Sequence, residues 1–192
     1  MRIGVLALQG ACREHLRMLE RCGVSPVAVK KPSELLGLEG LVIPGGESTT
    51  IGKLMVTYGL AEPIKGRHER GMAIYGSCAG LVLLAASTVE HTGQPLLGLM
   101  DIVARRNAFG RQCDSFEAEL DIPPIGAEPL TGVFIRAPWI ESAGEKVQLI
   151  ASYEGHGIMA RQGRVLVTAF HPELTDDERI HRYFLKEVVA RQ

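Results

Sequence analysis

The sequence has no excess of charge of either sign and no long hydrophobic run. Its 21 Lys and Arg balance 22 Asp and Glu, so the formal net charge of -1 indicates no basic surface for nucleic acid or an anionic membrane. No apolar stretch approaches the roughly 18 residues that a membrane-spanning helix needs. The opening run "MRIGVLALQG" is too short for the core of a signal peptide and is typical of a β-strand. We therefore expect a cytoplasmic protein with no nucleic-acid or membrane partner.

Metal-binding and redox motifs are also missing. The four cysteines form no C-x-x-C pair, which argues against a zinc ribbon or a thioredoxin-type site. Only Cys78 has unusual neighbours, and the other cysteines, Cys113 included, are expected to pack as small hydrophobic side chains.

The histidines form no H-x-x-H or H-E-x-x-H spacing, so no metal site is expected. One of them, His171, is considered separately below. The remaining five have no obvious partners. We expect His156 to lie in a turn and four others to be exposed in polar segments: His15, His68, His91 and His181.

The 192 residues are enough for one domain with a sizeable core, and no linker or repeat divides them. In the first half, apolar β-branched runs alternate with helical patterns, which is typical of a parallel sheet covered by helices. This pattern predicts strands at 2–8, 25–31, 40–46 and 71–77, and helices at 11–23, from about 49 and before 71. The region from about 98 to 160 predicts shorter, partly antiparallel strands, because Gly or Pro separates its β-branched runs. We expect a single domain over residues 1–192.

The C-terminal segment "TDDERIHRYFLKEVVARQ" predicts a helix. Thr175 and Glu178 have the spacing of a capping box at its start. One apolar face follows at helical spacing, made by Ile180, Tyr183, Phe184 and Val188.

The stretch "YGSCAG" places Cys78 between a predicted strand and the apolar run "LVLLAA". Gly76 and Gly80 complete the G-x-nucleophile-x-G spacing of a nucleophile elbow, a sharp strand-to-helix turn that would expose Cys78. A buried cysteine at a tight turn would show the same short pattern. The stretch alone leaves both interpretations open.

A histidine follows another predicted strand in "VLVTAFHPE". Pro172 disfavours helical backbone at His171, and Glu173 is close enough to orient its imidazole. A surface histidine before a proline-started helix is the alternative. The elbow at Cys78 favours a catalytic base, because a nucleophilic thiol needs one and active crevices lie at the carboxyl ends of parallel strands.

Two glycines follow a third strand in "LVIPGGESTT" and allow backbone N–H groups to converge on an anion. In acyl transfer that anion is the tetrahedral oxyanion, and the N–H groups of Gly46 and Ala79 would form its hole. A tight turn with Glu47 or Ser48 capping the next helix is the alternative, and the two are compatible. The spacing in "GESTTIGK" does not match a phosphate-binding P-loop.

Six motifs occur in order between residues 6 and 175: "LALQGACREH", "PGGESTT", "GSCAG", "RNAFGRQCDSFE", "GVFIRAP" and "FHPELT". With a Cys elbow and a later His and Glu two residues apart, the chain resembles class I (triad) glutamine amidotransferases. Within them it resembles the glutaminase subunits of pyridoxal 5′-phosphate synthases, a likeness in which "PGGESTT" matters most. The resemblance implies a flavodoxin-like, three-layer α/β/α fold with a mixed, mostly parallel open sheet and helices on both faces.

The resemblance also implies roles for single residues. Cys78 would be the nucleophile, and His171 and Glu173 would complete the triad. Glutamine contacts would fall on Gly46, Glu47, Ser48, Arg106, Ile135 and Arg136. The chain departs from the family at Ser77, where Thr is more frequent, and in a slightly longer loop that leaves the register at Arg106 open.

The implied activity is hydrolysis of L-glutamine through a γ-glutamyl thioester, with no cofactor and no metal. The ammonia would pass to a (β/α)8-barrel synthase subunit that makes pyridoxal 5′-phosphate from a pentose phosphate and a triose phosphate. The implied complex is a large hetero-oligomer with twelve copies of each subunit, in which docking orders the loop near Gly46. Alternatives are a related Cys-His-Glu hydrolase or peptidase, a glutaminase serving another synthase, and a silent subunit, which would normally have lost a triad residue.

Overall fold

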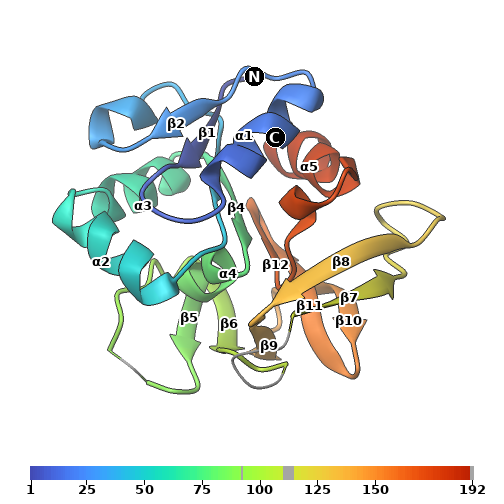
Figure 1. Ribbon diagram of the computed structural model, residues 1–192. Helices are drawn as coiled ribbons and strands as arrows, with labels where there is room; N and C mark the ends of the chain where they lie inside the picture. Colours follow the sequence, from blue (N-terminus) through green and yellow to red (C-terminus); the bar gives the residue numbers. More distant parts are fainter. Residues whose placement is uncertain (92, 110–114, 191–192) are drawn as a thin grey trace.

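The computed structural model describes residues 1–91, 93–109 and 115–190 (Figure 1). Cys113 and part of the motif "RNAFGRQCDSFE" lie outside these residues. The strands are β1 (Ile3–Leu6), β2 (Val27–Val29), β3 (Gly40–Ile43), β4 (Ala73–Ser77), β5 (Ala85–Thr88), β6 (Met100–Arg105), β7 (Ser115–Leu120), β8 (Leu130–Ile135), β9 (Trp139–Ala143), β10 (Gln148–Tyr153), β11 (His156–Gln162) and β12 (Val165–Thr168). The helices are α1 (Cys12–Arg21), α2 (Ser48–Thr57), α3 (Ala61–Glu69), α4 (Ala79–Leu84) and α5 (Arg179–Tyr183). Short 3₁₀ segments are η1 (Pro32–Leu35) and η2 (Pro172–Leu174), and η3 (Phe184–Val189) continues α5 as a π-helix.

The main sheet has the strand order β2-β1-β3-β4-β12-β11-β9-β6-β5, with β10 paired to β11. From β2 to β12 the pairs are parallel, and β11 pairs antiparallel with β12, β9 and β10. Strands β6 and β9 are antiparallel, β5 and β6 are parallel, and β7 and β8 form a separate antiparallel pair. The predictions of a mixed, mostly parallel sheet and of antiparallel pairing in the second half are confirmed.

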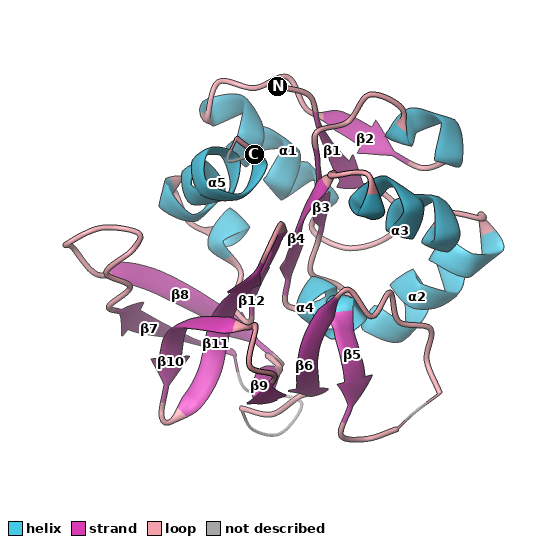
Figure 2. Ribbon diagram, turned by 180° about the vertical axis from the view of Figure 1, so that it is seen from behind, coloured by secondary structure: helices cyan, strands magenta, loops and turns pink. Residues whose placement is uncertain are grey.

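Helices cover both faces of the parallel strands. Figures 1 and 2 place α1 and α5 on one side of β1, β3, β4 and β12, and α2 and α3 on the other. Every residue of these four strands is buried, as their nearly continuous apolar sequences require. None of the helices in the described residues is both long and apolar enough to span a bilayer.

Strand β2 is shorter than predicted. It covers residues 27–29 rather than 25–31 and lies at the edge of the sheet, paired only with β1. Pro26, which precedes it, has no N–H to donate to a ladder. The ladder therefore begins after the proline.

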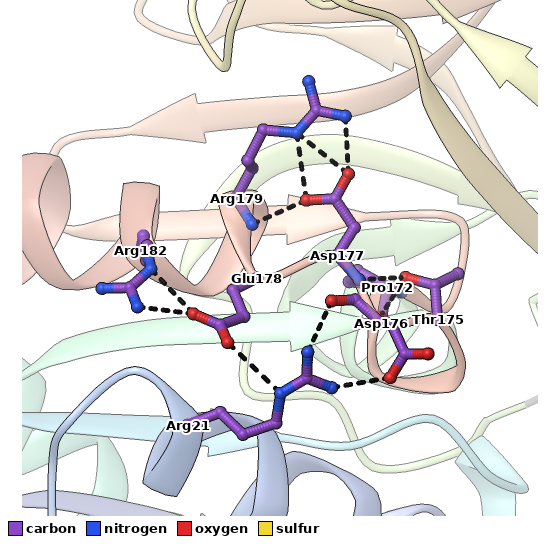
Figure 3. Close-up of polar contacts among 8 residues, drawn as sticks. All are labelled: Arg21, Pro172, Thr175, Asp176, Asp177, Glu178, Arg179 and Arg182. Carbon is purple, nitrogen blue, oxygen red and sulfur yellow. Dashed lines mark hydrogen bonds and ion pairs between the residues drawn. The ribbon is translucent and has the colours of Figure 1, made fainter.

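The predicted capping box at the C-terminal helix is wrong. Helix α5 begins at Arg179, and Thr175 instead accepts a hydrogen bond from the Asp177 N–H (3.2 Å). The Asp177 carboxylate accepts from the backbone N–H of Arg179 (2.9 Å), so it satisfies the first N–H of the helix from the residue before the N-cap Glu178 (Figure 3). Of the predicted apolar face, Ile180, Phe184 and Val188 are buried and Tyr183 is half-buried.

Candidate active site

Cys78 lies at the turn between β4 and α4. Its backbone has φ 46° and ψ -100°, outside the regions usual for an L residue, and its N–H donates to the Thr168 carbonyl of β12 (2.8 Å). A Cβ on Gly76 would lie 2.5 Å from the carbonyl carbon of Gly80, and one on Gly80 would collide with the Ile43 carbonyl. The local structure is therefore the elbow that the spacing predicts, and such strain is typical of functional sites.

The Cys78 side chain is less exposed than expected for an elbow, at 7%. Its Sγ lies 3.9 Å from the Ile135 carbonyl at the end of β8. It lines a pocket together with Gly46, Glu47, Ser48, Ala79, Val82, Arg106, Asn107, Ile135, Arg136 and Pro138. The residues predicted to form the oxyanion hole and those predicted to contact glutamine all line this pocket. The thiol is thus covered by pocket walls that come from four separate segments.

His171 is buried next to Cys78. Its Nδ1–H donates to Oε1 of Glu173 (2.7 Å), and its backbone N–H donates to the Val133 carbonyl of β8 (2.9 Å). Burial alone would lower the pKa of His171, but hydrogen bonds with Cys78 and Glu173 outweigh it and raise that pKa from 6.5 to about 10. The imidazolium is therefore the stable form beside the sulfur at neutral pH.

Glu173 lies in η2 and is 5% exposed. Burial would raise the pKa of its carboxyl, but the neighbouring His15 and the N–H of His171 lower it to about 2. An ionised carboxylate at this position can hold the imidazole of His171 in one orientation and stabilise its positive charge.

The loop after β3 is held by contacts from other strand ends. The Gly45 N–H donates to Oγ of Ser77, the last residue of β4 (3.1 Å). A Cβ on Gly45 would collide with the His171 ring, and one on Gly46 would lie 2.5 Å from Oε1 of Gln9. Two glycines in sequence are needed because this loop packs against other groups on both sides.

Glu47 and Arg106, which were both predicted to contact glutamine, pair with each other, with 3.2 Å between Oε1 and Nη2. Glu47 also accepts from the Thr49 hydroxyl (3.0 Å) and backbone N–H (3.4 Å), so it caps α2. Glu47 therefore caps α2 and also lines the pocket, so its two predicted roles are compatible. Arg105 is bound instead to Glu141 (2.8 and 3.0 Å), and it is Arg106 that lines the pocket with Cys78.

Backbone strain is concentrated at the pocket. In the described part of the chain, five non-glycine residues have positive φ: Cys78, His91, Asn107, Arg136 and Glu154. Three of them, Cys78, Asn107 and Arg136, line the pocket. Side chains held this way depend on the surrounding fold for their direction.

Two histidines predicted to be exposed are fully buried. His15 in α1 and His181 in α5 are both 0% exposed. His15 Nδ1 lies 2.9 Å from His181 Nε2, and His15 Nε2 lies 2.9 Å from Ser77 Oγ. Helical spacing would have revealed His15, because it precedes Met18 and Leu19 by three and four residues on the buried face of α1.

The other histidines differ in their surroundings. His68 is half-buried with Nδ1 2.9 Å from the Met72 carbonyl, and His91 is exposed as predicted. His156 is not a turn residue but the first residue of β11, and its ring stacks on Trp139 with centroids 3.6 Å apart. No group of three or more His, Cys, Asp or Glu side chains within the described ranges is arranged to hold a metal ion.

Comparisons with known proteins cover nearly the whole chain. The model of the SNO glutamine amidotransferase family matches residues 5–190. A curated relative from Pelotomaculum thermopropionicum, named pyridoxal 5′-phosphate synthase subunit PdxT, is 56% identical over 189 residues, which cover 98% of this chain and 96% of the relative. A relative of the same name from Geobacillus kaustophilus is 55% identical over 188 residues, covering 98% and 95%.

Solved structures agree on the fold. A crystal structure described as a glutamine amidotransferase is 48% identical, covers 96% of this chain and 97% of its own, and superposes with a TM-score of 0.90. A putative GMP synthase subunit from Thermoplasma acidophilum is 20% identical, with coverage of 97% and 92% and a TM-score of 0.67. This second likeness concerns the fold alone.

Proposed function

Since the chain belongs to the SNO glutamine amidotransferase family, we propose that it hydrolyses the side-chain amide of L-glutamine and delivers the ammonia to a synthase subunit that makes pyridoxal 5′-phosphate. One observation carries the proposal. Cys78, on a strained turn, lines a single pocket with Gly46, Ala79 and Arg106. The thiol raises the pKa of the buried His171, whose ring is hydrogen-bonded to Glu173.

The chemistry takes two stages. The Cys78 thiolate attacks the amide carbon, and the carbonyl electrons move onto oxygen, which the N–H groups of Gly46 and Ala79 stabilise. The His171 imidazolium protonates the leaving nitrogen, the C–N bond breaks, and ammonia departs from a γ-glutamyl thioester. Neutral His171 then takes a proton from water, the hydroxide attacks the thioester, and the C–S bond breaks to release glutamate and restore the thiolate.

Recognition of free glutamine needs charges of both signs, because the substrate carries an α-carboxylate and an α-ammonium. Arg106 and Glu47 supply them on adjacent parts of the pocket wall. Arg106 suits the carboxylate and Glu47 the ammonium, so the bound zwitterion replaces one ion pair by two. Ser48, Ile135 and Arg136 complete the contacts that we assign to glutamine.

The relatives at 55–56% identity are named as subunits of pyridoxal 5′-phosphate synthase, which supports a synthase partner for this chain. We expect that partner to be a (β/α)8 barrel acting on a pentose phosphate and a triose phosphate, in a cytoplasmic complex with twelve copies of each subunit. Docking would order the loop at Gly46. Ammonia then reaches the barrel without release to solvent.

The test is ammonia release from glutamine, measured with and without the synthase subunit. Wild type with its partner should be active, Cys78→Ala should be inactive, and Cys12→Ala, a half-buried thiol outside the pocket, should match wild type. Activity that survives in Cys78→Ala contradicts the mechanism. Full activity without any partner contradicts the coupling. Cleavage of peptides instead of free glutamine would favour the alternative hydrolase.

A further inference from the structure

A chain of buried polar side chains runs from α5 to the triad. His181 Nε2 lies 2.9 Å from His15 Nδ1, and His15 Nε2 lies 2.9 Å from Ser77 Oγ and 3.4 Å from Glu173 Oε2. His15, His181 and Ser77 are 0% exposed and Glu173 is 5% exposed. Buried polar groups cost stability unless they are satisfied, and the mechanism above uses only Glu173.

The two imidazoles are held rigidly. The ring of Tyr75, also fully buried, contacts both His15 and His181 edge-to-face, with centroids 5.9 and 5.8 Å apart. At the surface, Arg21 at the end of α1 binds the Asp176 carboxylate (2.8 Å) and Glu178 (3.2 Å), as Figure 3 shows. The helix that carries His15 is thereby fixed to the segment that follows Glu173.

The surroundings of His15 favour a proton on one of its two nitrogens. Among the described residues, Glu173 Oε2 and His181 Nδ1 are buried and have no hydrogen-bond partner. A proton on His15 Nε2 faces Glu173 Oε2 and leaves Nδ1 free to accept from His181 Nε2–H. The orphan Nδ1 of His181 is then a bare acceptor, which costs less than a buried N–H without an acceptor. In the opposite tautomer the Ser77 hydroxyl would donate to Nε2, but His181 would keep a buried N–H without an acceptor and a lone pair of His15 would face the carboxylate. The repulsion between that lone pair and the carboxylate therefore favours the proton on Nε2.

The electrostatics agree with two neutral rings. Burial lowers the pKa of His15, although Glu173 and Glu14 oppose it and His171 adds to it. Burial and the neighbouring His15 lower the pKa of His181 to about 3, with Glu173 opposing. His15 therefore faces the carboxylate as a neutral ring and not as a second cation.

We propose that His15 is a positioning residue for glutamine hydrolysis, an inference that rests on the proposed function. Its Nε2 is hydrogen-bonded to Ser77 Oγ (2.9 Å) and lies 3.4 Å from Glu173 Oε2. It thus orients the carboxylate that holds His171, and it also fixes the hydroxyl that accepts the Gly45 N–H beside the oxyanion loop. One imidazole therefore fixes the position of the base relative to that of the oxyanion loop.

A matched pair of variants tests this. His15→Gln can place an amide N–H near the position of Nε2, whereas His15→Asn reaches only the position of Nδ1. With the synthase subunit present, we expect kcat to fall about 10- to 100-fold in His15→Asn and less than about threefold in His15→Gln, because only the first loses the polar N–H that bonds to Ser77 and faces the charged carboxylate. The KM for glutamine should change less than about threefold in both.

His68→Asn, which alters a half-buried histidine outside the pocket, should leave both constants unchanged. Equal losses of kcat in the two His15 variants, or a loss confined to KM, would overturn the proposal. If His15→Asn does not fold, the pair Ser77→Ala and Ser77→Thr replaces it, with the loss expected in Ser77→Ala and recovery in Ser77→Thr. An inactive wild type would defeat the proposed function rather than the role of His15.

A second readout does not depend on activity. Nitrogen-15 NMR of the imidazoles in the full chain should show His15 protonated at Nε2 and unprotonated at Nδ1 between pH 6 and 8. A proton at Nδ1, or at both nitrogens, would overturn the assignment.

Discussion

The parallel half of the sheet (β2, β1, β3, β4 and β12) and the antiparallel half (β6, β9, β10 and β11, with the separate β7–β8 pair beside them) contribute different groups to one pocket. Cys78 follows β4, His171 follows β12, and the Gly45–Gly46 loop follows β3. Arg106 follows β6, and Arg136 follows β8. The reacting groups thus come from the parallel half, whereas the groups that we assign to glutamine come from both regions, with Glu47 after β3 and Arg106 after β6.

The two halves are also held together differently. Around the elbow, backbone packs directly on backbone or rings, as at Gly45 and Gly80. In the antiparallel half, side chains pair with one another, as in Arg105 with Glu141 and Trp139 with His156. Direct backbone contact fixes the distances that chemistry needs, whereas side-chain pairs allow a binding surface to differ between relatives of one fold.

The largest effect is expected from breaking the parallel half. Gly45→Ala places a Cβ where the His171 ring lies, so kcat for glutamine should fall about 100- to 1,000-fold. Gly66→Ala in α3, where a Cβ meets only the flexible Arg70 side chain at 3.5 Å, should keep wild-type kcat. Steady-state kinetics with the synthase subunit measures both, and a Gly45→Ala enzyme with normal kcat would contradict the expected geometry.

The antiparallel half should respond in KM instead. Arg106→Ala removes the cation proposed for the α-carboxylate, and the KM for glutamine should rise about 10- to 100-fold with a smaller change in kcat. Arg105→Ala is the matched control, because this neighbouring arginine is bound to Glu141. Similar effects of the two substitutions would remove the distinction between them.

Stability at acidic pH is expected to depend on a buried histidine that packs against the parallel half. His181 lies buried in α5, which covers the parallel half, and its pKa is about 3, below its ordinary 6.5. Between these values the unfolded chain binds a proton that the folded chain does not, so stability falls as the pH falls from about 6.5 toward 3. Tm should therefore decrease less steeply from pH 7 to 4 in His181→Gln than in wild type. Equal slopes of Tm against pH in the two proteins would show that His181 does not contribute to the pH dependence of stability.

At alkaline pH the sign is reversed. The pKa of His171 is raised from 6.5 to about 10, so its contribution to stability is complete below about pH 6.5 and is lost as the pH rises through 10. His171→Gln should lack this loss in a Tm series from pH 7 to 10.

The smallest effect is expected from the stacked pair at β9 and β11. His156→Ala removes the ring that stacks on Trp139 and should lower the free energy of unfolding by about 0.5–1.5 kcal/mol without changing kcat. Urea unfolding measures the difference, with His91→Ala at an exposed position as the control. A large loss of activity in His156→Ala would place catalytic machinery in the antiparallel half.

The sequence predicts those features of the site that depend on neighbouring residues in the chain. The glycines around Cys78 predict an elbow because only small residues allow the turn, and the structure has that turn. The burial of His15 was missed because its polar neighbours in "ACREHLRMLER" suggest an exposed residue. Its partners are 62 and 166 residues away in the sequence, so tertiary packing alone reveals them.

The same limit explains two further differences. Thr175 has a capping-box spacing, but Asp177 is closer to the true start of α5 and accepts the N–H of its first residue, Arg179. Glu47 and Arg106 are 59 residues apart, and no pattern in either segment indicates that they pair. Their contact depends on how the two halves of the sheet meet.

The glycines at the elbow and in the loop after β3 have an evolutionary consequence. A Cβ on Gly45, Gly76 or Gly80 would collide with backbone or with the catalytic imidazole, so substitution by alanine or any larger residue is excluded there. Homologues that come to serve different acceptors of ammonia must therefore diverge elsewhere, on surfaces built from side chains. The hydrolytic part of such an enzyme can stay constant over long divergence while its partner changes.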